Sequence, residues 1–467
     1  MQITSSAPVR FDEIRKLGFL IVPLAIVIGV GVAVAPIFVL AAVGAVILVG
    51  VLANGPLTRT AVVLVSSLTI LQVSAAAASG EKLGYLVILS VAAVFAVGNL
   101  VSRWSRLRAV GGIAMLPPII AVVCVVTASS VIALTSGVPL TSWLNDVPAY
   151  GMLPVAIILG LDLAVSDHQP HGVALILFAA GLATALAFAV QWTVRHGVTS
   201  LDFGRFLFSS MFLAGAALCL ALAYAFDGRR PYRMAFLATT LLFAMFVTAT
   251  RGAFVFLLPV GVTLVFAGVK RRWRIATLIV GAALTALTLV VVLSVAGDQY
   301  FNWSLIQLRL GGIWTLLFSG NALSDPSLYA RYLQTQALFA AWLSEPWFGV
   351  GPGVSYSYGG LVDSHPVDSP MAIFARFGVV GAFVFLGLFI AILAGKLRRQ
   401  AHWVPATALL SFVGLILVWS LGSSPLDDKG VALGLIPLTG LCGIWRKGTP
   451  SRVPIESEST RNERRGD

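Results

Sequence analysis

The chain has 467 residues, of which 58% are hydrophobic and 11% are charged, and its mean hydropathy is +0.95. This balance lies far outside that of soluble globular proteins and predicts a polytopic membrane protein. The formal net charge of +12 comes mainly from short connections between apolar runs and from a charged tail. We therefore expect no nucleic-acid partner.

The N-terminal residues carry three basic side chains, Arg10, Arg15 and Lys16, ahead of an apolar run. No convincing small-residue cleavage site follows, and the apolar pattern simply continues. We interpret this region as a retained first membrane span and not as a signal peptide.

Apolar runs long enough to cross a bilayer recur along the chain. A hydrocarbon core of about 30 Å needs roughly 20 apolar residues per helix, because lipid cannot satisfy an irregular backbone. The pattern predicts an all-α, polytopic membrane helical bundle of about 12–14 transmembrane helices, and the second and sixth runs are the shortest. The fourteen runs lie near residues 18–35, 37–53, 61–78, 84–101, 110–134, 149–165, 172–190, 204–226, 233–250, 252–269, 275–296, 370–395, 403–421 and 430–445.

The basic residues alternate between the two sides of this bundle. With the N-terminus inside, 23 of the 31 Lys and Arg residues fall in cytoplasmic connections or in the tail, as the positive-inside rule requires. Both termini are therefore predicted to be cytoplasmic. The expected organisation is spans 1–11 within residues 1–296, an outer loop 297–369 containing short helices, spans 12–14 within 370–445, and a disordered cytoplasmic tail 446–467.

One of the outer basic residues, Arg251 in "FVTATRGAFVFL", is the only ionisable side chain between Arg233 and Lys270. A tight, polar outer hairpin would explain it without any function. However, an arginine at a helix end near the bilayer costs on the order of 1 to 3 kcal/mol unless it is paired, and such residues commonly mark functional sites. Both interpretations stay open at this point.

The outer loop is the one long connection, and long connections in compact proteins often carry function. Its first part, from Gly297, is amphipathic and suits the membrane interface. The stretch "DPSLYARYLQTQALFAAWLSEP" begins with Asp-Pro and ends before Pro346, which predicts a helix that carries Arg331. The following "WFGVGPGVSYSYGGLVDSHPVDSP" is rich in Gly and Ser and predicts an irregular backbone.

Where the chain re-enters the membrane, Ser369 suits a helix N-cap and Pro370 the first helical position. His365 and Asp368 therefore precede a helix N-terminus, which favours anions. A loop histidine is commonly just solvated, but this one stands three residues from an acid. Its ordinary pKa of about 6.5 suits a general base.

Two other motifs carry weaker signals. The glycines of "GVGPG" have no βαβ context, so they indicate a sharp turn or a close backbone approach to a ligand and not a dinucleotide site. Asp427 in "PLDDKG" is interpreted as structural. No acidic pattern offers a divalent-metal site, and we expect neither a metal nor another cofactor.

Three stretches together resemble the O-antigen ligase and O-antigen polymerase superfamily, which also includes bacterial protein O-oligosaccharyltransferases. They are "TATRGAF" around Arg251, Arg331 followed by "LSEPWFGVGPGVSY", and "SHPVDSPMAIFARFGVVGAFVFL". The resemblance covers roughly residues 195–394. It implies an integral membrane glycosyltransferase of GT-C-like architecture in the bacterial cytoplasmic (inner) membrane, working in polysaccharide assembly for the cell envelope.

The resemblance also implies the substrates and the roles of single residues. Members move a glycan from an undecaprenyl-diphosphate carrier to a glycan, glycolipid or protein acceptor at the outer face, without a metal ion. Arg251 and Arg331 match the arginines that bind the diphosphate, and His365 matches the proposed base. Arg195, in "VRHGVTSLDFGRF", matches an outer-loop arginine more loosely.

The sequence departs from the family pattern at two positions. Many members have Asn where Asp368 stands, and an acid in the neighbourhood of Arg376. Asp368 is expected to orient His365 and to raise its pKa, and Arg376 to add a third cation near the diphosphate.

Other functions stay open from the residues alone. A transporter or flippase for a lipid-linked or anionic solute would use the same arginines for binding, although no internal repeat is evident. A structural partner in an envelope assembly would leave the charge cluster without a role. Ligase, polymerase and protein glycosyltransferase share the donor and differ in the acceptor, so these residues do not separate them.

Overall fold

The computed structural model describes residues 44, 47–71, 80–166, 170–194, 211–227, 231–247, 256, 258–259, 261, 326–363, 369–397 and 403–447. The chain divides into two compact units, 1–55 and 56–467. The described part of the first unit is helical over residues 47–53. All other elements belong to the second unit.

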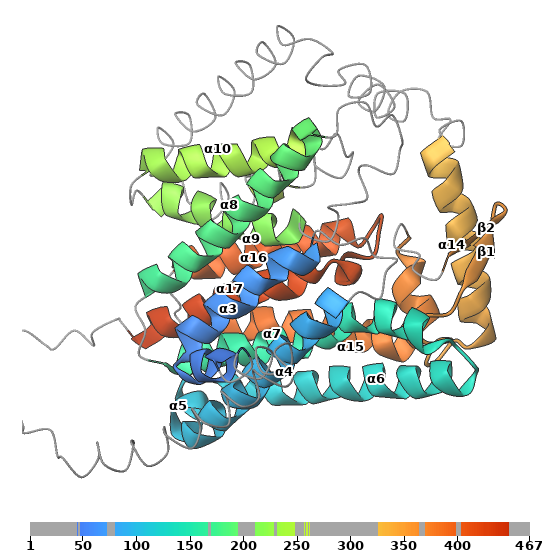
Figure 1. The fold of residues 1–467 in the computed structure, drawn as a ribbon, viewed down its shortest axis with the longest axis horizontal. Coiled ribbons are helices and arrows are strands. Elements are labelled where there is room, and N and C mark those ends of the chain that lie inside the picture. The colour runs from blue at the N-terminus through green and yellow to red at the C-terminus, as the bar shows by residue number, and fades with distance from the viewer. Residues whose placement is uncertain are drawn as a thin grey trace, which may run out of the picture. The chain divides into compact units, whose positions relative to one another are not determined.

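Helices make up nearly all of the second unit's described residues (Figure 1). The two strands, β1 (Tyr356–Tyr358) and β2 (Leu361–Asp363), form an antiparallel hairpin in which Tyr356 faces Asp363. The predicted all-helical class is thus confirmed apart from this hairpin. The helices are α3 (Pro56–Leu71), α4 (Gly80–Ser102), α5 (Trp104–Ala109), η1 (Gly112–Met115), α6 (Leu116–Thr135), α7 (Leu140–Val165), α8 (Pro170–Val194), α9 (Met211–Asp227), α10 (Pro231–Val247), α14 (Pro326–Ser344), α15 (Met371–Leu397), α16 (Trp403–Trp419), η7 (Pro425–Asp427) and α17 (Lys429–Lys447).

Several of these helices suit a membrane. Four segments within the described part of the chain are long and apolar enough to cross one: Leu83–Ser102, Gly112–Thr135, Leu140–Val165 and Met371–Ala394. Four shorter apolar helices accompany them: Pro170–Ala185, Met211–Asp227, Trp403–Trp419 and Lys429–Ile444. Large apolar side chains such as Val94 (72% exposed) and Phe383 (70%) stay on the outside, as lipid-facing positions do. The chain is a multi-pass membrane protein.

The described helices occupy most of the predicted spans. The predicted spans 18–35 and 275–296 lie outside the described residues, and 37–53 and 252–269 lie mostly outside them. The span predicted to begin at residue 149 begins nine residues earlier, as α7. The prediction stopped there because Asn145, Asp146 and Pro148 interrupt the apolar run, but Asp146 is buried and paired in the fold.

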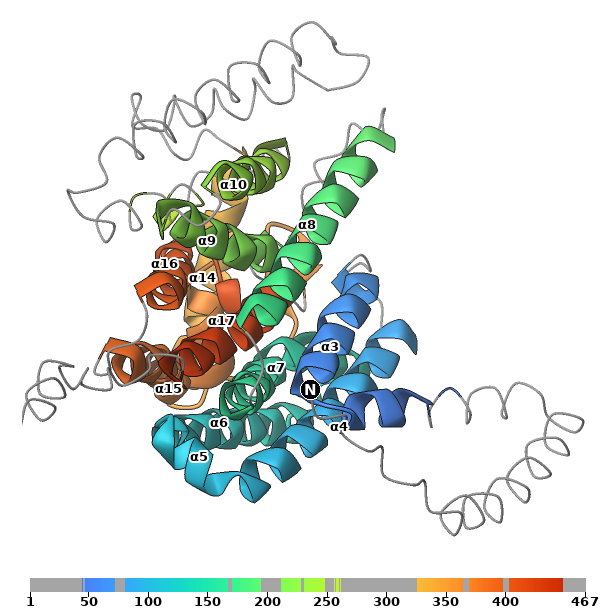
Figure 2. The ribbon, with the colours of Figure 1, turned by 90° about the vertical axis from the view of Figure 1, so that its left-hand side faces the viewer.

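The centre of the bundle is formed by α7 and α17. Viewed along the bundle, these two helices are enclosed by α3, α4, α6, α8, α9, α15 and α16 (Figure 2). Small residues let their backbones approach closely: a Cβ on Gly160 of α7 would lie 2.9 Å from the carbonyl oxygen of Ile436, and one on Gly440 of α17 would lie 2.7 Å from the Cβ of Leu163. Close packing of this kind holds membrane helices together, since burial from water cannot.

Candidate functional site

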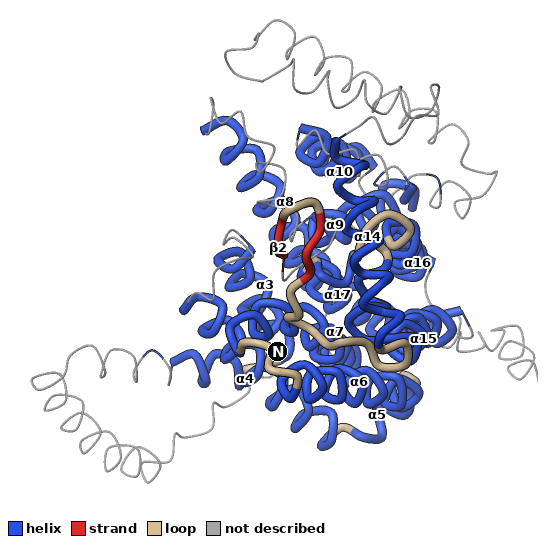
Figure 3. Tube along the Cα trace, turned by 90° about the vertical axis from the view of Figure 1, so that its right-hand side faces the viewer, coloured by secondary structure: helices blue, strands red, loops and turns tan. Residues whose placement is uncertain are grey.

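One end of the bundle carries α14, the β1–β2 hairpin and the turn between them. The predicted helix around Arg331 is confirmed as α14, and it lies crosswise to α6 (Figure 1). Figure 3 looks onto this end and shows the loop running from α14 to the hairpin across the ends of the spans. We call α14, residues 345–363 and residues 369–378 the outer platform, after the side on which the sequence predicts this part of the chain.

A small apolar core joins the parts of the outer platform. Leu338 of α14, Tyr356 of β1, and Ala372 and Ala375 of α15 are buried together. The side-chain amide of Gln334 donates to the hydroxyl of Tyr358 at 2.9 Å, which adds a polar link between α14 and the hairpin. The platform therefore has a core of its own, in addition to its contacts with the bundle.

Ser369 connects the start of α15 to α14. Its hydroxyl accepts a hydrogen bond from the backbone N–H of Met371 at 3.2 Å, which confirms the predicted N-cap. The same hydroxyl lies 2.9 Å from Oγ1 of Thr335, and Thr335 donates to the carbonyl of Arg331 one helical turn away. The residue that follows Asp368 in sequence is thus held beside the turn of α14 that carries the half-buried Arg331.

Helix α15 is broken at Gly378, where φ is 64° and ψ is −169°. The break removes the helical partners of two carbonyls and two N–H groups, and residues 346–351 replace them. Val350 N donates to the carbonyl of Ala375 at 2.8 Å, and Gly351 N donates to that of Arg376 at 3.1 Å. In return, the N–H groups of residues 379 and 380 donate to the carbonyls of residues 346 and 347. These four backbone groups at the break are therefore satisfied by the turn.

Glycine is required both in the turn and at the break in α15. Gly349 (φ 71°) and Gly351 (φ 92°) adopt backbone conformations that other residues rarely take. A Cβ on Gly351 would lie 2.5 Å from the carbonyl oxygen of Ser129, and one on Gly378 would overlap the carbonyl of Trp347. The glycines of "GVGPG" thus permit a sharp turn that approaches the protein's own helices.

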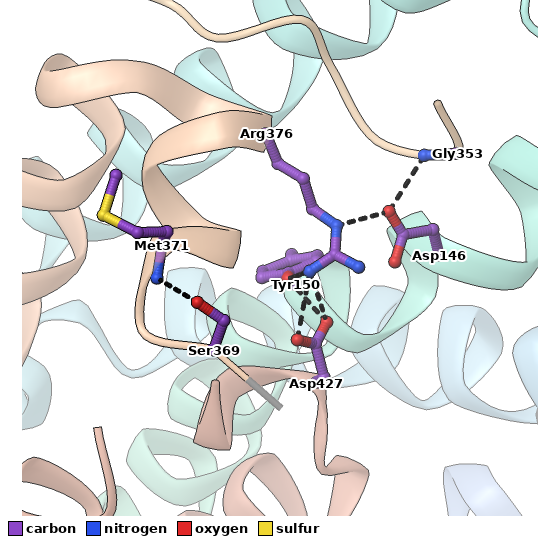
Figure 4. Close-up of polar contacts among 7 residues, drawn as sticks. All are labelled: Asp146, Tyr150, Gly353, Ser369, Met371, Arg376 and Asp427. Carbon is purple, nitrogen blue, oxygen red and sulfur yellow. Dashed lines mark hydrogen bonds and ion pairs between the residues drawn. The ribbon is translucent and has the colours of Figure 1, made fainter. Parts of the chain in front are cut away.

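Beneath this turn lies a buried charge cluster around Arg376 (Figure 4). Arg376 is 0% exposed. Its Nε lies 2.7 Å from Oδ2 of Asp146 on α7, and its NH1 lies 3.1 Å from Oδ2 of Asp427 on η7. NH1 also donates to the hydroxyl of Tyr150 at 2.8 Å, and that hydroxyl donates to Oδ1 of Asp427 at 2.5 Å. One arginine therefore joins α7, α15 and η7.

Asp146 extends this cluster to the glycine-rich turn, because its Oδ2 also accepts a hydrogen bond from Gly353 N at 2.9 Å. Tyr356 of β1 is buried within the electrostatic reach of Arg376, and burial raises the pKa of its phenol. Next to Asp427, the carboxyl of Asp428 accepts from Gly430 N at 2.7 Å and caps α17. Burial raises the pKa of the Asp428 carboxyl well above its ordinary value.

The structure separates the predicted site residues into three groups. His365, Asp368, Arg251 and Arg195 lie outside the described residues. Arg331 lies on α14, with its turn of the helix held beside Ser369. Arg376 is buried and paired with two carboxylates, and its predicted place as a third cation near the diphosphate stays a prediction.

Sequence reasoning missed Asp146 and Tyr150 as partners of the platform. The available signal was an acid inside an otherwise apolar helix, since a buried carboxylate requires a cation or several donors. Asp427 was interpreted as structural, and it is indeed buried against Arg376.

In a comparison with protein families, residues 234–386 match the family described as O-antigen ligase. Comparison with curated proteins gives no match. The matched range runs from α10 into α15, so it contains Arg251, Arg331, His365, Asp368 and Arg376 but not Arg195. Residues 234–386 of this multi-pass membrane protein are therefore a domain of the O-antigen ligase family.

Proposed function

We propose that the protein is a membrane glycosyltransferase that moves a glycan from a lipid diphosphate carrier, of the undecaprenyl type, to an acceptor hydroxyl at the outer face of the cytoplasmic membrane. The family match over residues 234–386 supports this class of reaction. The observation that carries the proposal is the contact between Thr335 and Ser369. It brings the turn of α14 that bears Arg331 beside Ser369, which follows His365 and Asp368 closely in the sequence, and this supports a cation near the proposed base.

The chemistry follows from the charges. A diphosphate leaving group gains negative charge as the glycosidic bond breaks, and fixed guanidinium groups can neutralise it. Arg331 and Arg251 are proposed for this role, and Arg195 for a weaker contact with the same substrate. His365 would accept the proton of the acceptor hydroxyl as it attacks the anomeric carbon with inversion, while Asp368 would hold the imidazole tautomer. No metal ion is needed in this scheme.

The orientation is part of the proposal. With both termini in the cytoplasm, the outer platform lies at the outer face of the membrane, where the proposed transfer takes place. The concentration of Lys and Arg in the opposite connections supports this arrangement.

A transfer assay on purified protein in liposomes tests the proposal. The donor would be an undecaprenyl-diphosphate glycan, with candidate acceptors added in the presence of a metal chelator. We expect His365→Ala and Arg331→Ala each to lower transfer about 100-fold or more. Arg108→Ala, which removes an exposed arginine of α5, is the matched control and should transfer like the wild type.

The alternative is a transporter or flippase for a lipid-linked or anionic solute. Movement of the lipid-linked glycan across the bilayer, with no transfer in any variant, would replace the enzyme proposal. Transfer that survives both substitutions would overturn the assigned roles of His365 and Arg331.

A further inference from the structure

The turn 346–353 is attached to the bundle both by backbone and by charge, and Arg376 takes part in both attachments. Its carbonyl accepts from Gly351 N at 3.1 Å. Its guanidinium holds Asp146, whose Oδ2 accepts from Gly353 N at 2.9 Å. The same residue therefore fixes two positions of the turn that are two residues apart.

We propose that Arg376, held by Asp146 and Asp427, is a positioning residue that registers the glycine-rich turn 346–353 on the broken helix α15, and that transfer depends on this register. The catalytic part of this inference rests on the proposed function. Its structural part does not, because the attachment of the turn can be measured without any substrate.

An arginine suits this role because its planar guanidinium presents several donors in fixed directions. Nε lies 2.7 Å from Oδ2 of Asp146 in an ion pair, and NH1 donates to Asp427 and Tyr150, so the side chain joins α7, α15 and η7 at once (Figure 4). Apolar side chains of equal volume would fill the same space but would not specify which turn residue lies opposite which helix residue. Buried ion pairs often add little net stability, so specificity of arrangement is the more consistent explanation for this one.

Position along the sequence relates the cluster to the proposed catalytic residues. Ser369 caps the helix two turns before Arg376, and Thr335 holds Ser369 from the side of α14. In the sequence, His365 and Asp368 stand between β2, which follows the turn, and Ser369 at this helix start. A shift of the turn relative to α15 is therefore expected to lower the rate of transfer.

A ligand-binding arginine and a positioning arginine respond differently to substitution of their partners. If Arg376 bound the diphosphate, Asp146→Asn would free positive charge and leave donor binding equal or stronger. If Arg376 positions the turn, Asp146→Asn should loosen the turn and lower kcat while the donor KM stays the same.

The experiment combines amide hydrogen exchange with transfer kinetics on full-length protein. Asp146→Asn weakens the attachment from the bundle side. Gly353→Ala weakens it from the turn side with every charge in place, because its Cβ would lie 2.6 Å from the backbone N of Trp143. Asp162→Asn is the matched control, since Asp162 lies on the same helix in another buried ion pair, with Arg59.

We expect exchange in peptides covering 346–363 to rise about tenfold in Asp146→Asn and in Gly353→Ala. In both variants kcat should fall about tenfold or more with the donor KM within about twofold. Asp162→Asn should leave exchange in 346–363 and kcat unchanged.

Unchanged exchange in 346–363 would overturn the positioning role, and so would a raised donor KM with kcat intact. If the wild type transfers no glycan, the proposed function fails, while the exchange measurements still decide whether the turn is registered by this cluster.

Discussion

Helix α7 carries a buried ion pair near each of its ends, and the two pairs join different parts of the molecule. Asp162 pairs with Arg59 of α3 and accepts from the side-chain amide of Asn99 of α4 at 2.5 Å, so its partners all lie on helices of the bundle. Asp146 pairs with Arg376 and also accepts from Gly353 in the glycine-rich turn. Ionisable groups within membrane proteins are candidates for function by default. The location of the residues that contact each aspartate therefore distinguishes an ion pair that joins helices from one that attaches a loop.

The largest loss of stability is expected from a substitution at the break in α15, where the glycine-rich turn is attached. Gly378→Ala would place a Cβ against the carbonyl of Trp347 in a backbone conformation that only glycine adopts easily. We expect a loss of about 3 kcal/mol or more, seen as a large drop in the thermal unfolding temperature in detergent.

Gly387→Ala is its control on the same helix, because a Cβ there meets nothing within 4 Å. This change should be neutral or stabilising by up to about 1 kcal/mol. Equal effects of the two substitutions would show that the break is not essential to the fold.

Replacing each pair with apolar residues should separate their roles. Arg59→Met combined with Asp162→Leu should cost at most about 1 kcal/mol, because apolar side chains that pack well can replace a whole buried ion pair. Asn99, which would lose Asp162 as an acceptor, is only half-buried. Arg376→Met combined with Asp146→Leu should cost about 3 kcal/mol, since Gly353 N would stay buried without its acceptor and Asp427 would lose its cation. Thermal unfolding of the two double variants checks this, and similar costs would contradict the distinction.

A smaller effect is expected at the contact between α14 and α15. Ser369→Ala removes both the N-cap and the hydroxyl contact with Thr335. A loss of about 1 to 2 kcal/mol is expected, with lower transfer in the liposome assay. Thr240→Val, at a hydroxyl that donates to the carbonyl of Phe236 in its own helix, should change neither quantity. An equal loss in Thr240→Val would contradict the role of Ser369 in joining α14 to α15.

The smallest predicted effect concerns pH. Burial raises the pKa of Asp428, so its stabilising contribution is fully present below the ordinary carboxyl pKa and is lost as pH rises through the raised value. Asp428→Asn keeps an acceptor for Gly430 N without this titration. The unfolding temperature of the variant should therefore fall less with rising pH than that of the wild type. Parallel pH profiles would show that Asp428 does not titrate in this way.

Local signals in the sequence predicted much of the fold. Apolar runs predicted the helical class. The Asp-Pro pair that ends at Pro326 and the later Pro346 predicted the two ends of α14, and Ser369 predicted the start of α15. These features work through residues close in sequence, so they can be read from a single chain.

The missed features all depend on distant partners. Asp146 and Arg376 are 230 residues apart, and α7 extends through its polar first turns because Arg376 and Gly353 satisfy Asp146. The break at Gly378 is stable only because the turn 346–351 supplies the missing hydrogen bonds. A buried acid in an apolar helix signals that a partner exists, but it does not say where that partner lies.

An experimental structure with an undecaprenyl-diphosphate glycan donor bound would test the account most directly. We expect the diphosphate against Arg331 of α14, close to Ser369, with Arg376 still paired to Asp146 and Asp427. A diphosphate bound by Arg376, or bound away from the outer platform, would contradict it.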